Sequence, residues 1–199
     1  MWDNFGQQLY DNIILNDRWK LYLQGLGTTL YVTLGAAILG IILGSLVAIC
    51  KAYAKDNKKL WLLEKICNIY LTVFRGTPVM VQLLIFSWVI FASVPMDQLA
   101  FVGILAFGIN SGAYVAEIVR AGIQAVNIGQ TEAGRSLGLT KNMNMRLIVM
   151  PQAVKNMLPA LANEAITLLK ETAILGYIAV GDITYMATLI RRSEERRVG

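Results

Sequence analysis

The sequence contains no histidine, only two cysteines and few charged residues. Charged residues make up 16% of the 199 positions and apolar residues 56%, whereas soluble domains carry about 25% charged residues. This balance indicates a membrane protein. Without histidine there is no His-based catalytic triad and no His metal ligand, and Cys50 and Cys67 lack the CxxC spacing of a zinc or redox site. We therefore predict no catalytic residue and no metal site, and interpret both cysteines as packing residues.

Two further absences narrow the function. The phosphate-binding pattern GxxxxGK[ST] does not occur, so this chain does not hydrolyse ATP by that mechanism. The net charge of +5 comes from basic residues that are spread over several loops rather than gathered on one face. Such a distribution is typical of the flanks of membrane spans, and we predict no nucleic-acid partner.

Four apolar stretches are long enough to cross a hydrocarbon core, which needs roughly 20 helical residues. We predict spans over 27–50, 69–93, 99–119 and 152–180. Gly40 and Gly44 in the first span form a GxxxG pair, which we interpret as a helix-packing device. The preceding residues 1–26 carry acidic residues in place of a basic signal-peptide start, so we interpret the first span as a retained helix. We predict that residues 1–26 form an amphipathic segment on the outer interface.

The basic residues of the loops predict the orientation, because short cytoplasmic loops are enriched in Lys and Arg. Lysines lie between the first and second spans, and both Lys and Arg lie between the third and fourth, whereas residues 92–98 contain neither. The N-terminus is therefore predicted outside and the loop 121–150 inside the cell. We predict a multi-pass protein embedded in the lipid bilayer.

The loop 121–150 is polar but carries signals for two short helices. Asn127 and Gln130 form a plausible capping pair, and Gly138 offers the left-handed position that ends a helix over 128–137. Thr140 is predicted to cap a second short helix that Pro151 closes. The expected product is a compact helical hairpin that projects into the cytoplasm.

This hairpin carries a family resemblance. Glu132-Ala133, followed by Gly138, Ile148 and Pro151, resembles the EAA signature of ABC importer permeases, with Gly134 in place of a second alanine and Met150 in place of a leucine. Other segments from about residue 27 to 189 resemble the polar amino acid permeases of the histidine, glutamine, glutamate and arginine type. These are Phe74-Arg75-Gly76-Thr77-Pro78, Gln82, the run Asn110 to Glu117, Asn163-Glu164 and Leu169-Lys170-Glu171-Thr172.

The resemblance implies an all-α integral membrane fold, the MetI-like helical bundle of type I ABC importer permeases, with a cytoplasmic coupling-helix loop. It also implies a dimer of ABC ATP-binding subunits, a second permease subunit in a homodimer or heterodimer, and an extracytoplasmic solute-binding protein, in the bacterial cytoplasmic (inner) membrane. ATP and Mg would lie on the partner ATPase, with no cofactor in this chain. The implied ATPase-docking residues are Glu132, Ala133, Gly134, Arg135 and Gly138. The alternative is an ordinary surface helix with a glycine cap.

Polar residues inside the third and fourth spans follow helical spacing. Asn110, Tyr114 and Glu117 share one face of the third span, and Asn163, Thr167 and Lys170 share one face of the fourth. We hypothesise that these residues, with Gln82, line a path that holds the ammonium and carboxylate groups of an amino acid. Hydrogen bonds between helices are the alternative for each of them, and Glu117 and Lys170 are also compatible with positions at the two membrane interfaces.

Arg75 would lie within the second span. Gly76, Thr77 and Pro78 follow it directly, and they favour a local helix break of the kind found where backbone lines a cavity at membrane depth. The alternative is a positively charged anchor at the edge of the lipid. A functional role for Arg75 requires both its charge and the helix break that follows it.

Residues 192–199 do not fit the topology, because a basic tail is disfavoured outside the cell. We expect this tail to be non-native, the translation of a sequencing-adapter string, and expect the last transmembrane helix to be missing after residue 191. The predicted domains are thus the N-terminal segment 1–26, the transmembrane domain 27–191 and the tail 192–199.

The predicted function is a permease subunit that moves polar amino acids across the cytoplasmic membrane, coupled to ATP hydrolysis by a partner. One alternative is a secondary transporter or channel subunit driven by an ion gradient, although no inverted internal repeat is visible. Another is a helical scaffold whose loop binds a soluble protein while nothing crosses the membrane.

Overall fold

The computed structural model describes residues 6, 10–14, 17–56 and 60–198, and the described part is helical with no strand. Much of the predicted N-terminal segment, residues 1–5, 7–9 and 15–16, lies outside the described residues. The elements in chain order are η1 (Tyr10–Ile14), α2 (Arg18–Asp56), α3 (Trp61–Gly76), α4 (Val79–Ile85), η4 (Phe86–Ile90), η5 (Met96–Gln98), α5 (Leu99–Gln124), α6 (Ile128–Ser136), α7 (Lys141–Asn144), η6 (Met145–Val149), α8 (Met150–Glu171), η7 (Thr172–Ile178) and α9 (Ile183–Val198).

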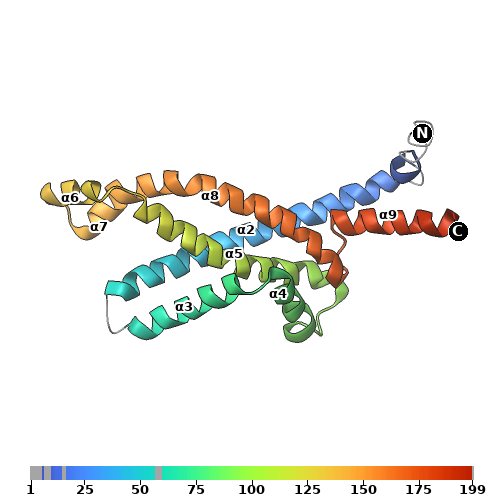
Figure 1. The fold of residues 1–199 in the computed structure, drawn as a ribbon, viewed down its shortest axis with the longest axis horizontal. Helices are drawn as coiled ribbons and strands as arrows, with labels where there is room; N and C mark the ends of the chain where they lie inside the picture. Colours follow the sequence, from blue (N-terminus) through green and yellow to red (C-terminus); the bar gives the residue numbers. More distant parts are fainter. Residues whose placement is uncertain (1–5, 7–9, 15–16, 57–59, 199) are drawn as a thin grey trace.

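The molecule is elongated, and its long helices run between two distinct ends (Figure 1). The short helices α6 and α7 lie at one end, together with the end of α2 and the start of α3, whereas the start of α2 and helix α9 lie at the other. The basic residues at the end of α2 and the start of α3 are therefore at the same end of the molecule as the basic residues around α6 and α7. This is the arrangement that the positive-inside pattern predicts.

Two described helices, Arg18–Ala54 and Met96–Gln124, are long and apolar enough to cross a membrane. Two bent pairs also meet these criteria when each pair is taken as one unit. Residues 61–76 and 79–90 meet at 107°, and residues 141–178 and 183–193 meet at 49°. The described residues therefore provide two straight candidate spans, and up to four if each bent pair is one span.

The helices are longer than the predicted spans. Helix α2 begins at Arg18, so residues 18–26 continue the first span instead of forming a separate segment. Nothing in these residues breaks a helix, and extending an existing helix fixes only one residue for each new hydrogen bond. Helix α5 likewise continues to Gln124, five residues past the predicted end.

The second predicted span is interrupted. Helix α3 ends at Gly76, and Thr77 and Pro78 take extended backbone conformations before α4 begins. Proline disfavours the helical conformation of the residue before it, and its ring leaves no N–H for the helix ladder. The Gly-Thr-Pro sequence thus produces the predicted break, which turns the chain through 107°.

Pro151 does not close the second short helix. The chain continues from α7 through the π-helical turn η6 into α8, with Pro151 in the first turn of α8. Pro151 thus lies where the π-helical turn changes into the α-helix, and its missing N–H coincides with this change in the hydrogen-bond ladder.

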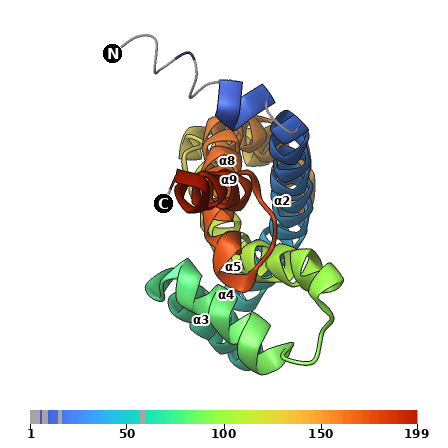
Figure 2. The ribbon, with the colours of Figure 1, turned by 90° about the vertical axis from the view of Figure 1, so that its right-hand side faces the viewer.

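The bundle is held together along α2 and α5, where Gly40 and Gly44 lie against α5. A Cβ atom on Gly40 would be 2.9 Å from Ser111 Oγ, and one on Gly44 would be 2.7 Å from the backbone oxygen of Gly112. The glycine pair is therefore a packing device, as predicted. The core beside it contains Val32, Leu83, Phe107, Leu168 and Leu175, all buried. Figure 2 shows α2, α5 and α8 gathered side by side when the molecule is viewed from the end that carries α9.

The close contact at Gly44 gives a stability prediction. Gly44→Ala places a methyl group against backbone, which cannot move aside, so we expect the free energy of unfolding to fall by about 1–3 kcal/mol. Thermal unfolding of the purified transporter measures this loss. Gly27→Ala in the same helix is the matched control, because nothing lies within 4 Å of its added Cβ atom. An equal effect of both substitutions would contradict the packing argument.

Candidate functional site

The hairpin of α6 and α7 is built by local capping. The Asn127 side-chain oxygen accepts a hydrogen bond from the Gly129 N–H at 2.8 Å, and the Thr140 hydroxyl accepts one from the Met143 N–H at 3.3 Å. Gly138 ends α6 in a left-handed conformation with φ +82°, where a side chain would be strained. The Leu139 N–H then donates to the Gly134 carbonyl at 3.2 Å. These bonds make the hairpin a compact knob, hereafter the knob, comprising residues 127–144.

The knob exposes most of the predicted docking residues. Glu132, Ala133, Arg135 and Gly138 are exposed, whereas Gly134 is buried. A Cβ atom on Gly134 would be 2.1 Å from Asn144 Oδ1 and 2.8 Å from Ile148 Cδ1. Gly134 is therefore packed against this chain itself, and the docking role that the resemblance implies for it stays a prediction. Its small size serves the packing of α6 against the following segment within this chain.

Two docking candidates were not predicted from the sequence. Ile128 and Leu137, at the two ends of α6, are 74% and 80% exposed. Both lie on the short helix at the end of the molecule that carries the basic residues, so they are candidates for contact with a partner protein. The signal in the sequence was their apolar character within an otherwise polar loop.

The helix break between α3 and α4 is fixed by a hydrogen-bond network. The Gln82 amide donates to the Phe74 carbonyl at 3.0 Å and to the Thr77 hydroxyl at 2.6 Å. The Asn110 amide of α5 donates to the same Phe74 carbonyl at 3.0 Å and to Gln82 Oε1 at 2.9 Å. Gln82 and Asn110 are both buried, so they tie the freed end of α3 to α5. Neither lines the pocket described below, although both were predicted to line the substrate path.

This network predicts coupling between two substitutions. Gln82→Leu removes several bonds, and Asn110→Leu leaves Gln82 Oε1 without this donor, so we expect each to lower the free energy of unfolding by about 1–3 kcal/mol. Thermal unfolding of the two single variants and the double variant measures the coupling. The double variant should lose less than the sum, because both residues belong to one network. Fully additive losses would show that they act separately.

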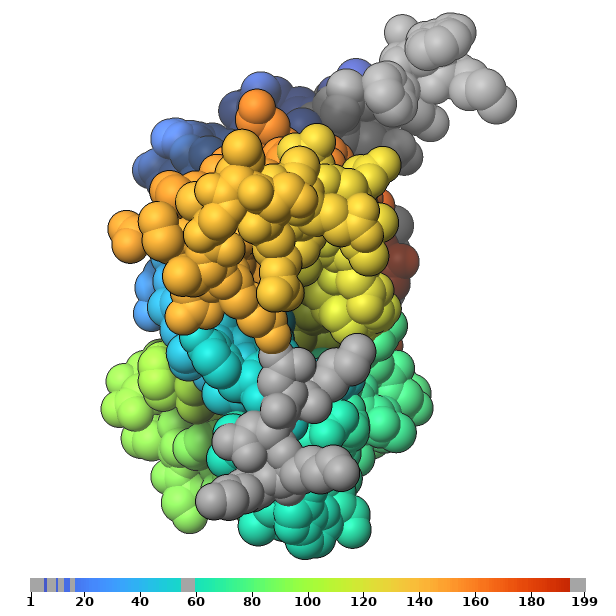
Figure 3. Space-filling view, turned by 90° about the vertical axis from the view of Figure 1, so that its left-hand side faces the viewer, coloured from blue at the N-terminus to red at the C-terminus, as the bar shows by residue number. Residues whose placement is uncertain are grey.

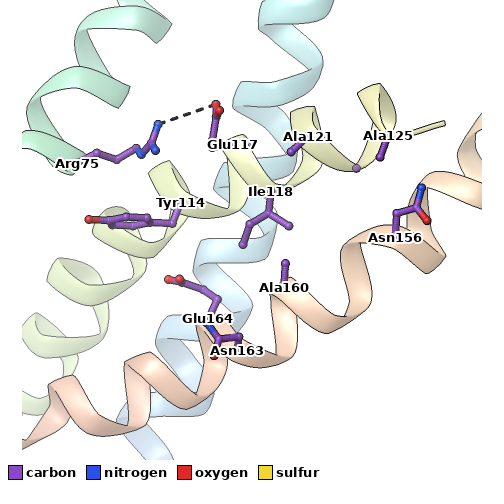
Figure 4. Close-up of a pocket in the computed structure, with 11 residues that line it drawn as sticks. Arg75, Tyr114, Glu117, Ile118, Ala121, Ala125, Asn156, Ala160, Asn163 and Glu164 are labelled. Atoms are coloured by element: carbon purple, nitrogen blue, oxygen red, sulfur yellow. Dashed lines mark ion pairs between the residues drawn. The ribbon is translucent and has the colours of Figure 1, made fainter. Parts of the chain in front are cut away.

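A pocket of about 460 Å³ lies between α3, α5 and α8. Figure 4 shows Arg75 approaching from α3, Tyr114 and Glu117 from α5, and Asn163 and Glu164 from α8. Arg75 Nη1 is 3.9 Å from Glu117 Oε2, and its guanidinium carbon is 5.6 Å from the centre of the Tyr114 ring. Arg120 also pairs with Glu117. The pocket thus presents charges of both signs, an amide and an aromatic ring.

The structure brings together only part of the predicted path. Of the predicted path residues, Tyr114, Glu117 and Asn163 line the pocket, whereas Thr167 and Lys170 do not. Arg75, which was predicted as part of the helix break, lines it as well. The Thr167 hydroxyl donates to the Asn163 carbonyl of its own helix at 3.0 Å, and Lys170 is exposed. The lining from α8 ends at Glu164. The face of α8 that was predicted to line the path therefore continues, with Thr167 and Lys170, beyond the pocket.

Glu164 was not among the predicted path residues. It lines the pocket, and its Oε1 atom accepts a hydrogen bond from the Ser111 hydroxyl at 2.7 Å. An acidic residue inside an apolar stretch was the available signal, because ionisable residues within a span usually face the protein interior or a path.

A bundle of membrane-length helices with a polar pocket between them and a helical knob at the basic end defines the membrane-spanning subunit of a transporter. The family model that matches residues 40–197 is described as a binding-protein-dependent transport system inner membrane component. The chain belongs to this family.

Named relatives and solved structures agree with this assignment. The chain is 39% identical over 172 residues to a putative glutamine transport system permease protein of Rickettsia typhi, covering 84% of this chain and 75% of the relative. It is 41% identical over 163 residues to an arginine transport system permease protein of Bacillus subtilis, covering 81% and 72%. A crystal structure of an amino acid ABC transporter with histidines matches with a TM-score of 0.78 and 42% identity, covering 87% of this chain and 78% of that chain.

The fold is also found in a more distant transporter. An inward-facing structure of the MetNI methionine ABC transporter matches with a TM-score of 0.70 at 18% identity, covering 93% of this chain and 98% of that chain. The predicted MetI-like permease fold is confirmed. The chain is the permease component of an amino acid ABC importer, an inner-membrane protein that works with a binding protein and a separate ATPase subunit. The alternatives of a secondary transporter and a scaffold are set aside.

Proposed function

We propose that this chain moves polar amino acids through the pocket between α3, α5 and α8, and that a partner ATPase drives this movement by holding the knob. The observation that carries the proposal is the knob itself. It is capped at both short helices and exposes Glu132 and Arg135 at the end of the molecule that bears the basic loops. Helices α5 and α8 lead directly into and out of the knob, so a displacement of the knob tilts both walls of the pocket.

The polar substrate class is supported by the lining of the pocket. An amino acid carries an ammonium and a carboxylate, which match Glu117 or Glu164 and Arg75 respectively. Relatives named for glutamine, arginine and L-cystine transport are 32–41% identical to this chain, and all three of these substrates are polar. The proposal covers this class as a whole.

The position of the pocket supports a second permease subunit, either another copy of this chain or a related one. Arg75 and Glu117 are partly exposed in the single chain, although α5 is long and apolar enough to cross a membrane and α3 meets the same criteria together with the following segment 79–90. A charged residue that faces lipid near the bilayer centre costs roughly 2.5–3.5 kcal/mol on insertion scales. A partner subunit that covers this face would remove that cost and close the path on its open side.

The remaining proposals concern topology and energy supply. Each bent helix pair forms one membrane crossing, the two basic loops lie in the cytoplasm, and the protein is multi-pass in the bacterial cytoplasmic membrane. ATP and Mg bind the two ATP-binding subunits, and this chain holds no cofactor. The described part of the chain contains no group of His, Cys, Asp or Glu residues that could hold a metal ion.

Reconstitution of the complete transporter tests the proposed function. In vesicles, ATP hydrolysis should increase when the binding protein is added together with a polar amino acid, and the radiolabelled amino acid should accumulate only with ATP. Uptake without ATP would instead support a secondary transporter. Hydrolysis that no polar amino acid stimulates would contradict the substrate class, and stimulated hydrolysis without uptake would contradict a path through this chain.

A further inference from the structure

Arg120 lies beside the polar pocket without forming part of it. Glu117 lines the pocket, and Arg120 follows three residues later on α5, yet it does not occur among the described residues that form the lining. It lies four residues before Gln124, the last residue of α5, which is about 6 Å along the helix. This end of α5 leads into the knob, which covers much of the surface that faces the viewer in Figure 3.

Two guanidinium groups share the Glu117 carboxylate, and they share it unequally. Arg120 Nε donates to Glu117 Oε2 at 2.9 Å, and Arg120 Nη2 pairs with Glu117 Oε1. Such a two-pronged contact is the strongest geometry between arginine and a carboxylate. Arg75 Nη1 is 3.9 Å from Glu117 Oε2, which is longer than a hydrogen bond. Arg120 therefore holds the carboxylate, and Arg75 only lies close to it.

The other contacts of the two arginines are consistent with this division. Arg120 Nη1 donates to the Gln124 side chain on the next turn of α5, which orients the guanidinium along its own helix. The Arg75 guanidinium carbon is 5.6 Å from the centre of the Tyr114 ring, a cation–π contact. A contact of this kind does not use up the five N–H donors of a guanidinium. Arg75 thus keeps donors for a carboxylate that enters the pocket.

A substrate carboxylate would compete with Glu117 for Arg75. While Arg120 holds Glu117, the charge of Glu117 is compensated and Arg75 is left for the substrate. Without Arg120, Glu117 would pair with Arg75 alone and would repel a second carboxylate beside it. Glu164 takes no part in this competition, because it accepts its hydrogen bond from the neutral Ser111 hydroxyl. It remains the acidic group for the ammonium of the substrate.

We propose that Arg120 is a positioning residue for substrate binding, which holds Glu117 and thereby leaves Arg75 available to the carboxylate of the amino acid. Arg120 acts through Glu117 and does not touch the substrate. The inference rests on the proposed function, because it concerns binding in the proposed path. It assigns the preference for ligands with a carboxylate to three residues together, one of which lies outside the pocket.

Equilibrium binding to the complete transporter in nanodiscs tests the proposal. The probes are radiolabelled L-glutamine and L-arginine, each displaced by the same molecule without its α-carboxylate, 4-aminobutanamide and agmatine respectively. Arg120→Gln should raise the Kd of both amino acids about fivefold, as expected when an exposed ion pair sequesters most of Arg75. It should not raise the Kd of the two analogues. An equal rise for amino acids and analogues would overturn the proposal, because the effect would then not act on the carboxylate.

A second substitution separates positioning from a merely structural role at the end of α5. Adding Glu117→Gln to Arg120→Gln removes the competing carboxylate, so the double variant should bind the amino acids nearly as well as the wild type. A double variant no better than Arg120→Gln would overturn the proposal. Thermal unfolding checks that both variants are folded.

Arg146→Gln is the matched control. It removes the same charge at an exposed residue that does not line the pocket, and it should leave the Kd of both amino acids unchanged. An effect equal to that of Arg120→Gln would assign the result to general surface charge and would overturn the proposal.

The result is distinguishable from a failure of the proposed function. If the wild type binds the amino acids and Arg120→Gln binds them equally well, only the role of Arg120 is contradicted. If the wild type binds neither amino acid, the proposed path through this pocket is contradicted, and the role of Arg120 with it.

Discussion

Glu132→Arg is expected to abolish binding of the ATPase subunit and to lower ATP-dependent uptake at least about tenfold, because reversing a charge within an interface costs several kcal/mol. Glu132 is exposed on the knob between Ile128 and Leu137, whose apolar side chains are also exposed. If this surface forms the interface with the ATPase, the guanidinium of the new arginine would be enclosed there. It would face groups of the ATPase that accommodate the carboxylate of Glu132. Pull-down of the ATPase with the purified permease measures binding, and reconstituted vesicles measure uptake.

The matched control for this experiment is Glu64→Arg. Glu64 lies in the first turn of α3, which begins at the same end of the molecule as the knob, and the substitution changes the charge by the same amount. It should leave pull-down and uptake close to wild type. If uptake is lost while the ATPase still binds fully, Glu132 acts in a later step of transport and not in docking. Wild-type binding and uptake by Glu132→Arg would remove the knob as the point where the ATPase acts.

The features predicted correctly from the sequence depend on local backbone chemistry. The Asn127 and Thr140 caps and the positive φ of Gly138 occur where the spacing places them. Each needs only residues within one helical turn, so the sequence contains the required information. The all-helical membrane fold was predictable for a similar reason, because a backbone in lipid must satisfy its own hydrogen bonds. The family motifs added the MetI-like arrangement of the helices.

The orientation of side chains within the bundle was not predictable from one sequence. Helical periodicity placed Asn110 and Glu117 on one face of a helix. It did not show that Asn110 would form hydrogen bonds with Gln82 and Phe74, whereas Glu117 would form an ion pair with Arg75. This difference between the two residues depends on the 107° turn after α3, which places α4 in contact with α5. The inward orientation of Gly134 likewise depends on how α6 packs against the segment after α7. In each case a tertiary contact decides the role.

Ala160→Trp is expected to lower uptake at least about tenfold, because steric access controls passage through a narrow polar path. Ala160 and Ile118 face each other across the pocket between α8 and α5 (Figure 4), so a large ring at this position fills the space that the substrate is proposed to cross. The substitution changes no charge and lies outside the knob. Pull-down of the ATPase should therefore stay at the wild-type level while uptake falls, which distinguishes a blocked path from a lost partner.

Leu158→Trp provides the comparison on the same helix. Leu158 is 57% exposed and lies two residues before Ala160, outside the polar pocket. Its substitution adds the same ring to a surface away from the path, so uptake should stay near wild type. Thermal unfolding of both variants checks that each is folded. If Ala160→Trp is folded, binds the ATPase and transports as well as Leu158→Trp, the substrate does not pass between α5 and α8, and a path through this pocket is excluded.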